Sequence, residues 1–246
     1  MSVERLCLDE QTTSFSAFLA YAHQCSSFSE LQLTKMLGAP EIEALLDFAL
    51  NHPLMALSLS GRVTSAAMPS LTRLVSGGSL TTLEVRNGGE VLPPSPEFCT
   101  AVAAAPLVRL SYDSTGLLDT LATGLTLLAA VSGHSTLCHL RLAFNSVAPA
   151  GRHAVGAALG LLVAADSRLV SLEISYCDLG NDGLLPLIDA LPRTTHLCRL
   201  YCEGNDFTQL TTTRLLAAVR AMASALRRSF TSKLRITLSC CATTPS

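Results

Sequence analysis

One short hydrophobic pattern, L-x-x-L-x-L, recurs along this chain with a near-regular spacing. Clear copies start at Leu54, Leu80, Leu107, Leu137, Leu169 and Leu197, and weaker copies start at Val3 and Phe28. From Val3 to Leu197 the start positions advance along the sequence in steps of 25, 26, 26, 27, 30, 32 and 28. A final alternating run, Leu234/Ile236/Leu238, closes the series. Eight copies in near-regular phase indicate a structural repeat that organises the whole chain.

Each copy is followed by a loop and then by an apolar stretch at helical spacing, so that one repeat is predicted to be strand, turn and helix. The predicted helices span residues 41–50, 97–105, 117–131, 151–165, 183–191 and 211–228. Asn181 and Asp182 are candidate caps for the helix that is predicted to start at Gly183. The small residues Gly156 and Gly160 predict close stacking of their helix on a neighbour. One such repeat cannot bury its apolar face alone, so the repeats must stack, with their strands forming a parallel sheet.

These features resemble the leucine-rich-repeat family, in particular its ribonuclease-inhibitor-like subtype with a helix in each repeat. The best match is L-R-L-A-F-N at 140–145, followed by 169–179 and 197–205. The family places Asn or Cys eight residues after the first Leu, where this chain has Asn145, Cys177 and Asn205, but Arg62, Gly88 and Thr115 in earlier repeats. The resemblance implies an α/β solenoid, a horseshoe with a concave parallel sheet and convex helices. It also implies one domain over residues 1–241 with about eight to nine repeats, and a short tail at 242–246.

Composition narrows the class of protein. Apolar residues make up 49% of the chain and charged residues 15%. That balance predicts a folded chain with a large core. The net charge of -2 argues against a general nucleic-acid or membrane-surface binder. The charge is uneven, with seven acidic and two basic residues in 1–50, and six basic and no acidic residues in 207–246. Neither a signal peptide nor an apolar run of about 20 residues is visible, so a cytoplasmic location is expected.

The side chains between the inward Leu positions should point to the concave face and form a partner-binding surface. The candidate residues are Glu84, Arg86, Arg109, Asp113, Arg141, Phe144, Glu173, Tyr176, Arg199, Tyr201 and Glu203. Arg and Tyr are common anchors of protein interfaces, and three aromatic residues fall on successive predicted strands. A second candidate surface is a basic docking patch near the C-terminus, made of Arg214, Arg220, Arg227 and Arg228. The alternative for that patch is the charged outer face of a terminal repeat.

No motif for catalysis or for a cofactor is recognisable, and the cysteines and histidines do not follow metal-ligand spacing. Cys177 and Cys202 are expected to be core thiols. We therefore expect a non-enzymatic scaffold that binds a protein partner on its concave sheet. Two alternatives stay open. One is a structural subunit of a cytoskeletal or ribonucleoprotein complex, docked through its charged ends, where RNA is a candidate only for the basic end. The other is implied only by the resemblance to the ribonuclease-inhibitor-like subtype, which includes GTPase-activating proteins. It is a GTPase-activating protein with Arg62 or Arg86 as the candidate arginine.

Overall fold

The computed structural model of the chain describes residues 3–229, apart from positions 10, 13, 36, 62, 88–91 and 166–167 and the side chains of 225–229. The final run Leu234/Ile236/Leu238 lies outside the described residues. The chain divides into two compact units, Met1–Leu117 and Leu118–Ser246, which we call unit 1 and unit 2. In both units strands alternate with helices and all the strand pairs are parallel, which confirms the predicted α/β class.

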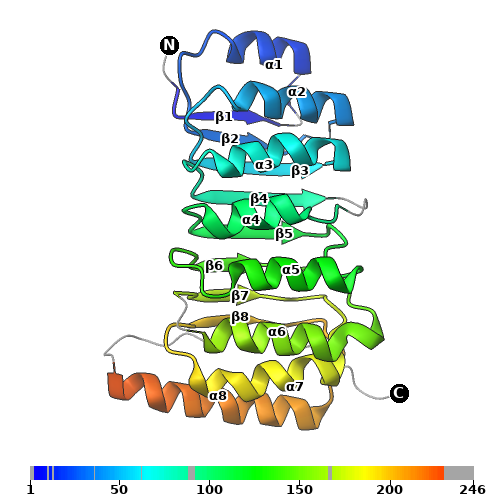
Figure 1. The fold of residues 1–246 in the computed structure, drawn as a ribbon, viewed down its shortest axis with the longest axis vertical. Coiled ribbons are helices and arrows are strands. Elements are labelled where there is room, and N and C mark those ends of the chain that lie inside the picture. Colours follow the sequence, from blue (N-terminus) through cyan, green and yellow to red (C-terminus); the bar gives the residue numbers. More distant parts are fainter. Residues whose placement is uncertain are drawn as a thin grey trace. The chain divides into compact units, whose positions relative to one another are not determined.

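Within its described residues, unit 1 carries five parallel strands, each paired with the next in the chain. The strands are β1 (Arg5–Leu8), β2 (Glu30–Leu33), β3 (Ala56–Gly61), β4 (Thr82–Asn87) and β5 (Arg109–Asp113). Between them come helices α1 (Phe15–Ala22), α2 (Ala39–Ala49), α3 (Met68–Ser76, after the 3-10 turn η1 at Ser65–Ala67) and α4 (Pro96–Ala104). Helices α2, α3 and α4 lie on the same side of the sheet (Figure 1).

Two rows of mostly aliphatic side chains hold this sheet onto its helices. In strand register the first row is Leu6, Leu31, Leu57, Leu83 and Leu110, and the second is Leu8, Leu33, Leu59, Val85 and Tyr112. Every one of these side chains is at most 2% exposed. Burying a Leu side chain fully contributes about 1.5–3 kcal/mol, so the two rows supply much of the stability of unit 1. The repeat phase found in the sequence is therefore the register of the sheet.

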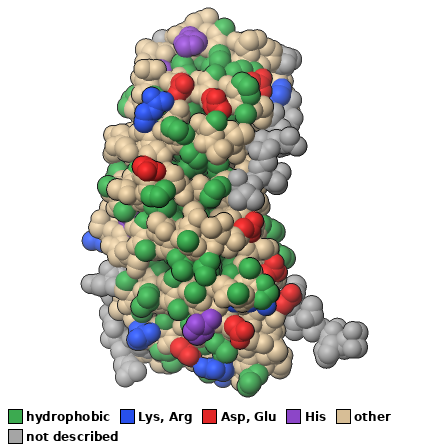
Figure 2. All heavy atoms as spheres, turned by 45° about the vertical axis from the view of Figure 1, so that its right-hand side comes forward, with side chains coloured by type: hydrophobic (Ala, Val, Ile, Leu, Met, Phe, Trp, Pro, Cys, Tyr) green, Lys and Arg blue, Asp and Glu red, His purple; other side chains and the backbone are tan. Residues whose placement is uncertain are grey.

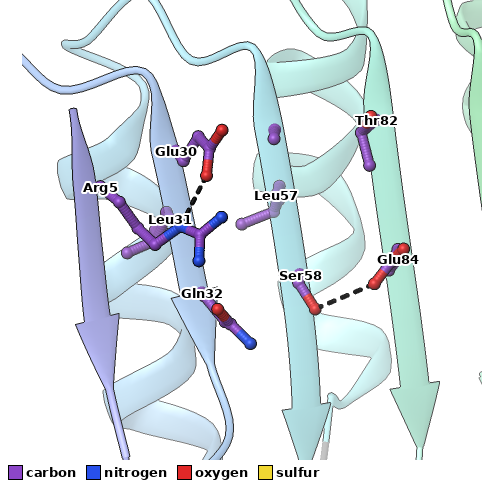
Figure 3. Close-up of a pocket in the computed structure, with 9 residues that line it drawn as sticks. Arg5, Glu30, Leu31, Gln32, Leu57, Ser58, Thr82 and Glu84 are labelled. Atoms are coloured by element: carbon purple, nitrogen blue, oxygen red, sulfur yellow. Dashed lines mark hydrogen bonds and ion pairs between the residues drawn. The ribbon is translucent and has the colours of Figure 1, made fainter.

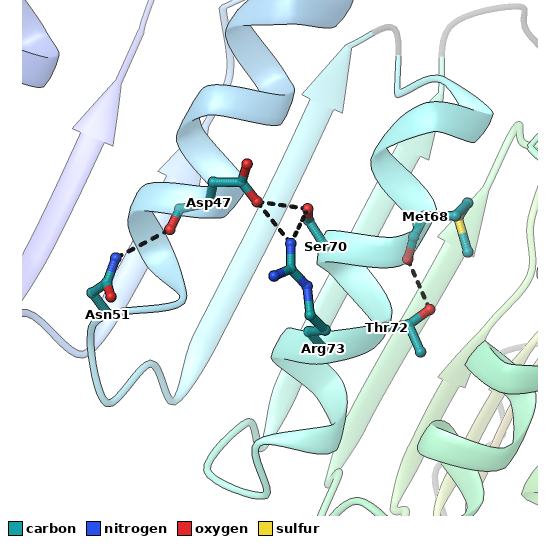
Figure 4. A network of polar contacts seen from close by, with 6 residues as sticks. All are labelled: Asp47, Asn51, Met68, Ser70, Thr72 and Arg73. Carbon is teal, nitrogen blue, oxygen red and sulfur yellow. Dashed lines mark hydrogen bonds and ion pairs between the residues drawn. The ribbon is translucent and has the colours of Figure 1, made fainter.

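Polar contacts join neighbouring helices at the surface of unit 1. Asp47 of α2 accepts hydrogen bonds from the hydroxyl of Ser70 (2.7 Å) and from the guanidinium of Arg73 (3.0 Å), both on α3 (Figure 4). The side chains of Arg73 and Asp47 are 62% and 59% exposed. Solvent therefore screens this ion pair, and it contributes little to stability.

The described part of unit 2 carries three parallel strands, β6 (His139–Arg141), β7 (Ser171–Glu173) and β8 (Arg199–Tyr201), again paired in chain order. Its helices are α5 (Leu121–Val131), α6 (Arg152–Ala164), α7 (Gly180–Ala190) and α8 (Gln209–Ser229), with short 3-10 turns η2 (Pro149–Gly151) and η3 (Leu191–Arg193). Leu140, Leu172 and Leu200 align across the three strands and are at most 3% exposed. The core of unit 2 thus repeats the construction of unit 1.

Helices α6 and α7 approach each other through glycines. A Cβ added to Gly156 would overlap the carbonyl oxygen of Gly183, and one added to Gly160 would lie 2.9 Å from the carbonyl oxygen of Pro186. The close stacking predicted for Gly156 and Gly160 is therefore present, because only glycine leaves room for the neighbouring backbone.

Asparagine side chains link the turns of successive repeats. Asn205 is fully buried, accepts hydrogen bonds from the backbone N–H groups of Cys177 (3.2 Å) and Leu179 (3.1 Å), and donates to the carbonyl of Ile174 (2.8 Å). In unit 1 the buried Asn87 makes the same kind of link, because its side chain both accepts from the N–H and donates to the carbonyl of Val63 (3.0 Å each). These bonds satisfy turn backbone that would otherwise be buried without partners.

The cap predicted at Asn181 and Asp182 is wrong. Helix α7 begins at Gly180, three residues before the predicted start, and Leu179 occupies its cap position. The side-chain oxygen of Asn181 instead accepts hydrogen bonds from the N–H of Thr208 (3.0 Å) and the hydroxyl of Thr211 (2.6 Å), at the start of α8. Asn181 therefore joins two repeats instead of starting its own helix.

Replacing Leu172 tests the shared core of unit 2. Leu172→Ala should lower the free energy of unfolding by about 2–5 kcal/mol, because it leaves a cavity, and Leu172→Asp should prevent unit 2 from folding. Thermal melting followed by circular dichroism measures both. The matched control is Leu161→Asp, since Leu161 is 69% exposed on α6, and this variant should melt as the wild type does. A Leu172→Asp protein with unchanged melting would contradict the assigned core.

Replacing Gly156 tests the contact between α6 and α7. Gly156→Ala should destabilise the protein by roughly 1–3 kcal/mol, because the methyl group forces the two helices apart. Gly38→Ala is the control, since its added Cβ would meet nothing closer than 3.6 Å. Chemical denaturation of both variants gives the comparison, and equal stability of the two would show that the helices separate at no cost.

Candidate partner-binding surface

We call the face of each unit's sheet that is turned away from its helices the open face. In unit 1 the open face carries two rows of side chains that alternate with the buried Leu rows. The first row is Arg5, Glu30, Ala56, Thr82 and Arg109, and the second is Cys7, Gln32, Ser58, Glu84 and Ser111. The strands therefore place Glu84 and Arg109 of the predicted surface on one face.

A hollow of about 390 Å³ lies on the open face of unit 1. It forms because β3 contributes the small side chains Ala56 and Ser58, while longer side chains stand on the neighbouring strands (Figure 3). Its lining is Arg5, Glu30, Leu31, Gln32, Ala56, Leu57, Ser58, Thr82 and Glu84. A second, smaller hollow of about 200 Å³ shares Gln32, Ser58 and Glu84 with it and continues toward Arg86.

Some of the charged side chains around this hollow form ion pairs and one does not. The guanidinium of Arg5 donates to the carboxylate of Glu30 (2.7 Å), and this hydrogen bond raises the pKa of Arg5. Arg86 lies 3.7 Å from the carboxylate of Asp113. Glu84 accepts a hydrogen bond from the hydroxyl of Ser58 (3.3 Å), and no cation among the described residues pairs with it. One carboxylate of the hollow is thus left without a positive partner.

Asp113 does not lie where the sequence analysis expected it. It was predicted to point outward to a partner, but its side chain is only 1% exposed. The strand β5 ends at Asp113 and the chain turns immediately, with Ser114 at a φ of 51°, so the expected alternation stops there. Asp113 therefore cannot touch a partner directly, and its contact with Arg86 positions that exposed guanidinium.

In unit 2 the open face carries the predicted charged residues in register. Arg141 and Glu173 are direct neighbours on β6 and β7, and their side chains form an ion pair of 2.7 Å. Tyr201 stands beside Glu173 on β8, and Arg199 is exposed two positions earlier on the same strand. Glu203 is half-buried just after β8. Of the charged residues of this face, Arg199 is the one most available to another molecule.

Phe144 and Tyr176 form a stacked pair on unit 2. Their ring centroids are 4.9 Å apart and their planes differ by 2°. They lie just beyond the ends of β6 and β7, four positions after the aligned Leu140 and Leu172, so the repeat itself brings them together. They remain 50% and 45% exposed. The sequence pattern predicted three aromatic residues on successive strands, whereas two of them lie in the turns that follow the strands, and Tyr201 alone is within one.

The backbone under both rings is left-handed. Phe144 has a φ of 60° and Tyr176 a φ of 56°, and the equivalent residue of the next repeat is Gly204, at 64°. A Cβ on Gly204 would overlap the ring of Tyr176, so the glycine makes room for that ring. A non-glycine residue in this conformation costs about 1–2 kcal/mol. Ser114, four positions after Leu110, has it as well, at a φ of 51°, so the left-handed turn is a feature of the repeat.

The predicted basic patch is described only in part. Arg214 pairs with Asp189 of α7 (2.7 Å), and Arg220 is placed on α8. The side chains of Arg227 and Arg228 lie outside the described residues. An arginine held by an acidic neighbour offers less charge to a partner, so Arg214 is a weaker docking residue than the sequence predicted.

Other functions would need a metal site, a membrane-spanning helix or an arginine placed for GTPase activation. Among the described residues no group of His, Cys, Asp or Glu could hold a metal ion, and no described helix is long and apolar enough to cross a membrane. Cys177 and Cys202 are buried, as expected. Arg62, a candidate for GTPase activation, lies outside the described residues, while Arg86 is held beside Asp113. On the face shown in Figure 2, charged side chains are scattered among uncharged ones.

No known protein-family model matches this sequence, and no curated protein matches it either. The fold class and the open faces are therefore assigned from the repeats of this chain and from its strand pairing.

Proposed function

We propose that this protein is a non-enzymatic scaffold of the leucine-rich-repeat type that binds a protein partner on the open faces of its sheets. The observation that carries the proposal is the exposed, stacked pair of Phe144 and Tyr176. Exposed aromatic rings on a rigid backbone are the residues that contribute most to protein–protein affinity.

Three features make this pair suitable as an anchor. The rings are held by the repeat geometry before any partner arrives, so little side-chain entropy is lost on binding. Their backbone strain is compensated by the surrounding turns, where the N–H groups of Phe144 and Tyr176 donate to the carbonyls of Ser175 (3.0 Å) and Glu203 (2.8 Å). Charged side chains, those of Arg141, Glu173 and Arg199, stand on the adjacent strands and would form a polar rim.

Removing the rings should abolish partner binding at little cost in stability. In the variant Phe144→Gly/Tyr176→Gly the backbone conformation suits glycine, so we expect the free energy of unfolding to change by about 1 kcal/mol or less. Loss of two anchor rings should weaken the partner's affinity by about 2 kcal/mol or more, which is roughly 30-fold in Kd. The measurement is affinity capture from a lysate of the source cell with quantitative mass spectrometry, followed by titration of the captured partner.

Leu161→Ala is the matched control for that experiment, because it removes an exposed hydrophobic side chain from a helix and leaves the open face intact. Partners should be lost with the double glycine variant and kept with the control. If both variants keep every partner of the wild type, the functional surface lies on the helices or the basic end, and the structural-subunit alternative is favoured.

Charge reversal tests the polar rim separately. Arg199→Glu should weaken capture of the same partner, mainly through slower association at low salt, because this guanidinium group is exposed on the open face of unit 2. Arg141 is left unchanged, since Arg141→Glu would set two carboxylates directly opposite each other and lower stability by itself. Association rates at two salt concentrations, measured by surface plasmon resonance, decide the question, and rates equal to wild type would remove Arg199 from the interface.

A further inference from the structure

The carboxylate of Glu84 stands in the hollow of unit 1 without a positive partner among the described residues. Figure 3 shows Glu84 on β4 beside Ser58 of β3, with Gln32 beyond it on β2. Ser58 donates the one hydrogen bond that reaches the Glu84 side chain from the described residues (3.3 Å). A half-buried carboxylate has lost part of its hydration, so an unused acceptor there favours a positively charged group from outside.

Neither of the arginines that line the two hollows, Arg5 and Arg86, forms an ion pair with Glu84. Arg5 bonds to Glu30 at 2.7 Å on the far side of the hollow. Arg86 follows Glu84 by two positions on the same strand, but its guanidinium lies 3.7 Å from the buried carboxylate of Asp113. Among the described residues Glu84 is therefore not neutralised, although the arginines of both hollows and the exposed Arg109 of the neighbouring strand β5 lie on the same unit.

The shape of the hollow suits one long side chain. Its volume is about 390 Å³ and its floor is made by Ala56 and Ser58, so there is room between β2 and β4 for an extended chain of methylene groups. The side-chain amide of Gln32 and the hydroxyls of Ser58 and Thr82 line the same space and can accept further N–H bonds. Polar acceptors around a floor of small side chains match the side chain of arginine or lysine.

We propose that this hollow is a subsite for a basic side chain of the bound protein, with Glu84 as the group that recognises its charge. This deepens the proposed function and rests on it only for the source of the cation. The guanidinium or ammonium group lies against the carboxylate of Glu84, and its aliphatic stem lies across Ala56. The partner segment that reaches unit 1 is accordingly basic.

A short peptide tests the subsite without the natural partner. The probe is acetyl-Gly-Arg-Gly-amide, titrated into the full-length ¹⁵N-labelled protein and followed by NMR, with the citrulline peptide as its neutral isostere. We expect saturable shifts at the amides of β3 and β4 with the arginine peptide at millimolar concentrations. The citrulline peptide should bind at least about threefold more weakly, and added salt should reduce the difference.

Glu84→Gln keeps the shape of the side chain and removes its charge, so it should abolish the preference for arginine over citrulline. Glu43→Gln is the matched control, because Glu43 lies on α2, on the other side of the sheet, and should leave the preference unchanged. Equal binding of the two peptides by the wild type, shifts confined to other parts of the chain, or an unchanged preference in Glu84→Gln would each overturn the proposal. Since the peptide experiment does not involve Phe144 or Tyr176, its failure would leave the proposed scaffold function standing on its own test.

Discussion

The alignment of one leucine per repeat across neighbouring strands is the constraint on which the rest of this structure depends. Leu140, Leu172 and Leu200 stand in register and are nearly inaccessible to solvent, and five leucines do the same in unit 1. Because strand side chains alternate, fixing that row inward fixes which residues face outward on every strand. A slip of one residue would bury charges and expose the core together. The packing of the core therefore determines which side chains stand on the open faces.

This constraint explains why the α/β class and most strands could be predicted from the sequence. An inward row needs apolar residues at fixed spacing, and the repeated L-x-x-L-x-L shows it directly. Helix boundaries were harder. Helix α1 (Phe15–Ala22) was not predicted, because its residues are mostly apolar or small on all sides and give no clear hydrophobic face. Helix α7 starts three residues before its predicted start, because Gly180, at a φ of 58°, leads from the turn into the helix. The buried link made by Asn87 was missed because the family's position for such a residue falls one place later, at Gly88.

The candidate surface could be predicted only as far as strands alternate. Glu84, Arg109, Arg141, Glu173 and Arg199 follow the alternation and stand on open faces, whereas Asp113 is buried because the turn begins at that residue. The stacking of Phe144 on Tyr176 depends on left-handed backbone at both residues, which no hydrophobic pattern reveals. The sequence also could not show that the guanidinium of Arg86 lies beside Asp113 and not beside Glu84. Ion pairs between long side chains depend on distances of a few ångströms, which the strand pattern does not fix.

Two surface features of this protein, the stacked rings of Phe144 and Tyr176 and the carboxylate of Glu84, do not serve the core. Left-handed backbone at a non-glycine residue raises the energy of the free molecule by about 1–2 kcal/mol. The Leu rows supply enough stability for the fold to carry such costs at its surface. The same turn position holds Ser114 and Gly204 in other repeats, so the left-handed turn belongs to the repeat itself. What distinguishes Phe144 and Tyr176 is that they place large, half-exposed rings at that position, and on this the proposed binding surface rests.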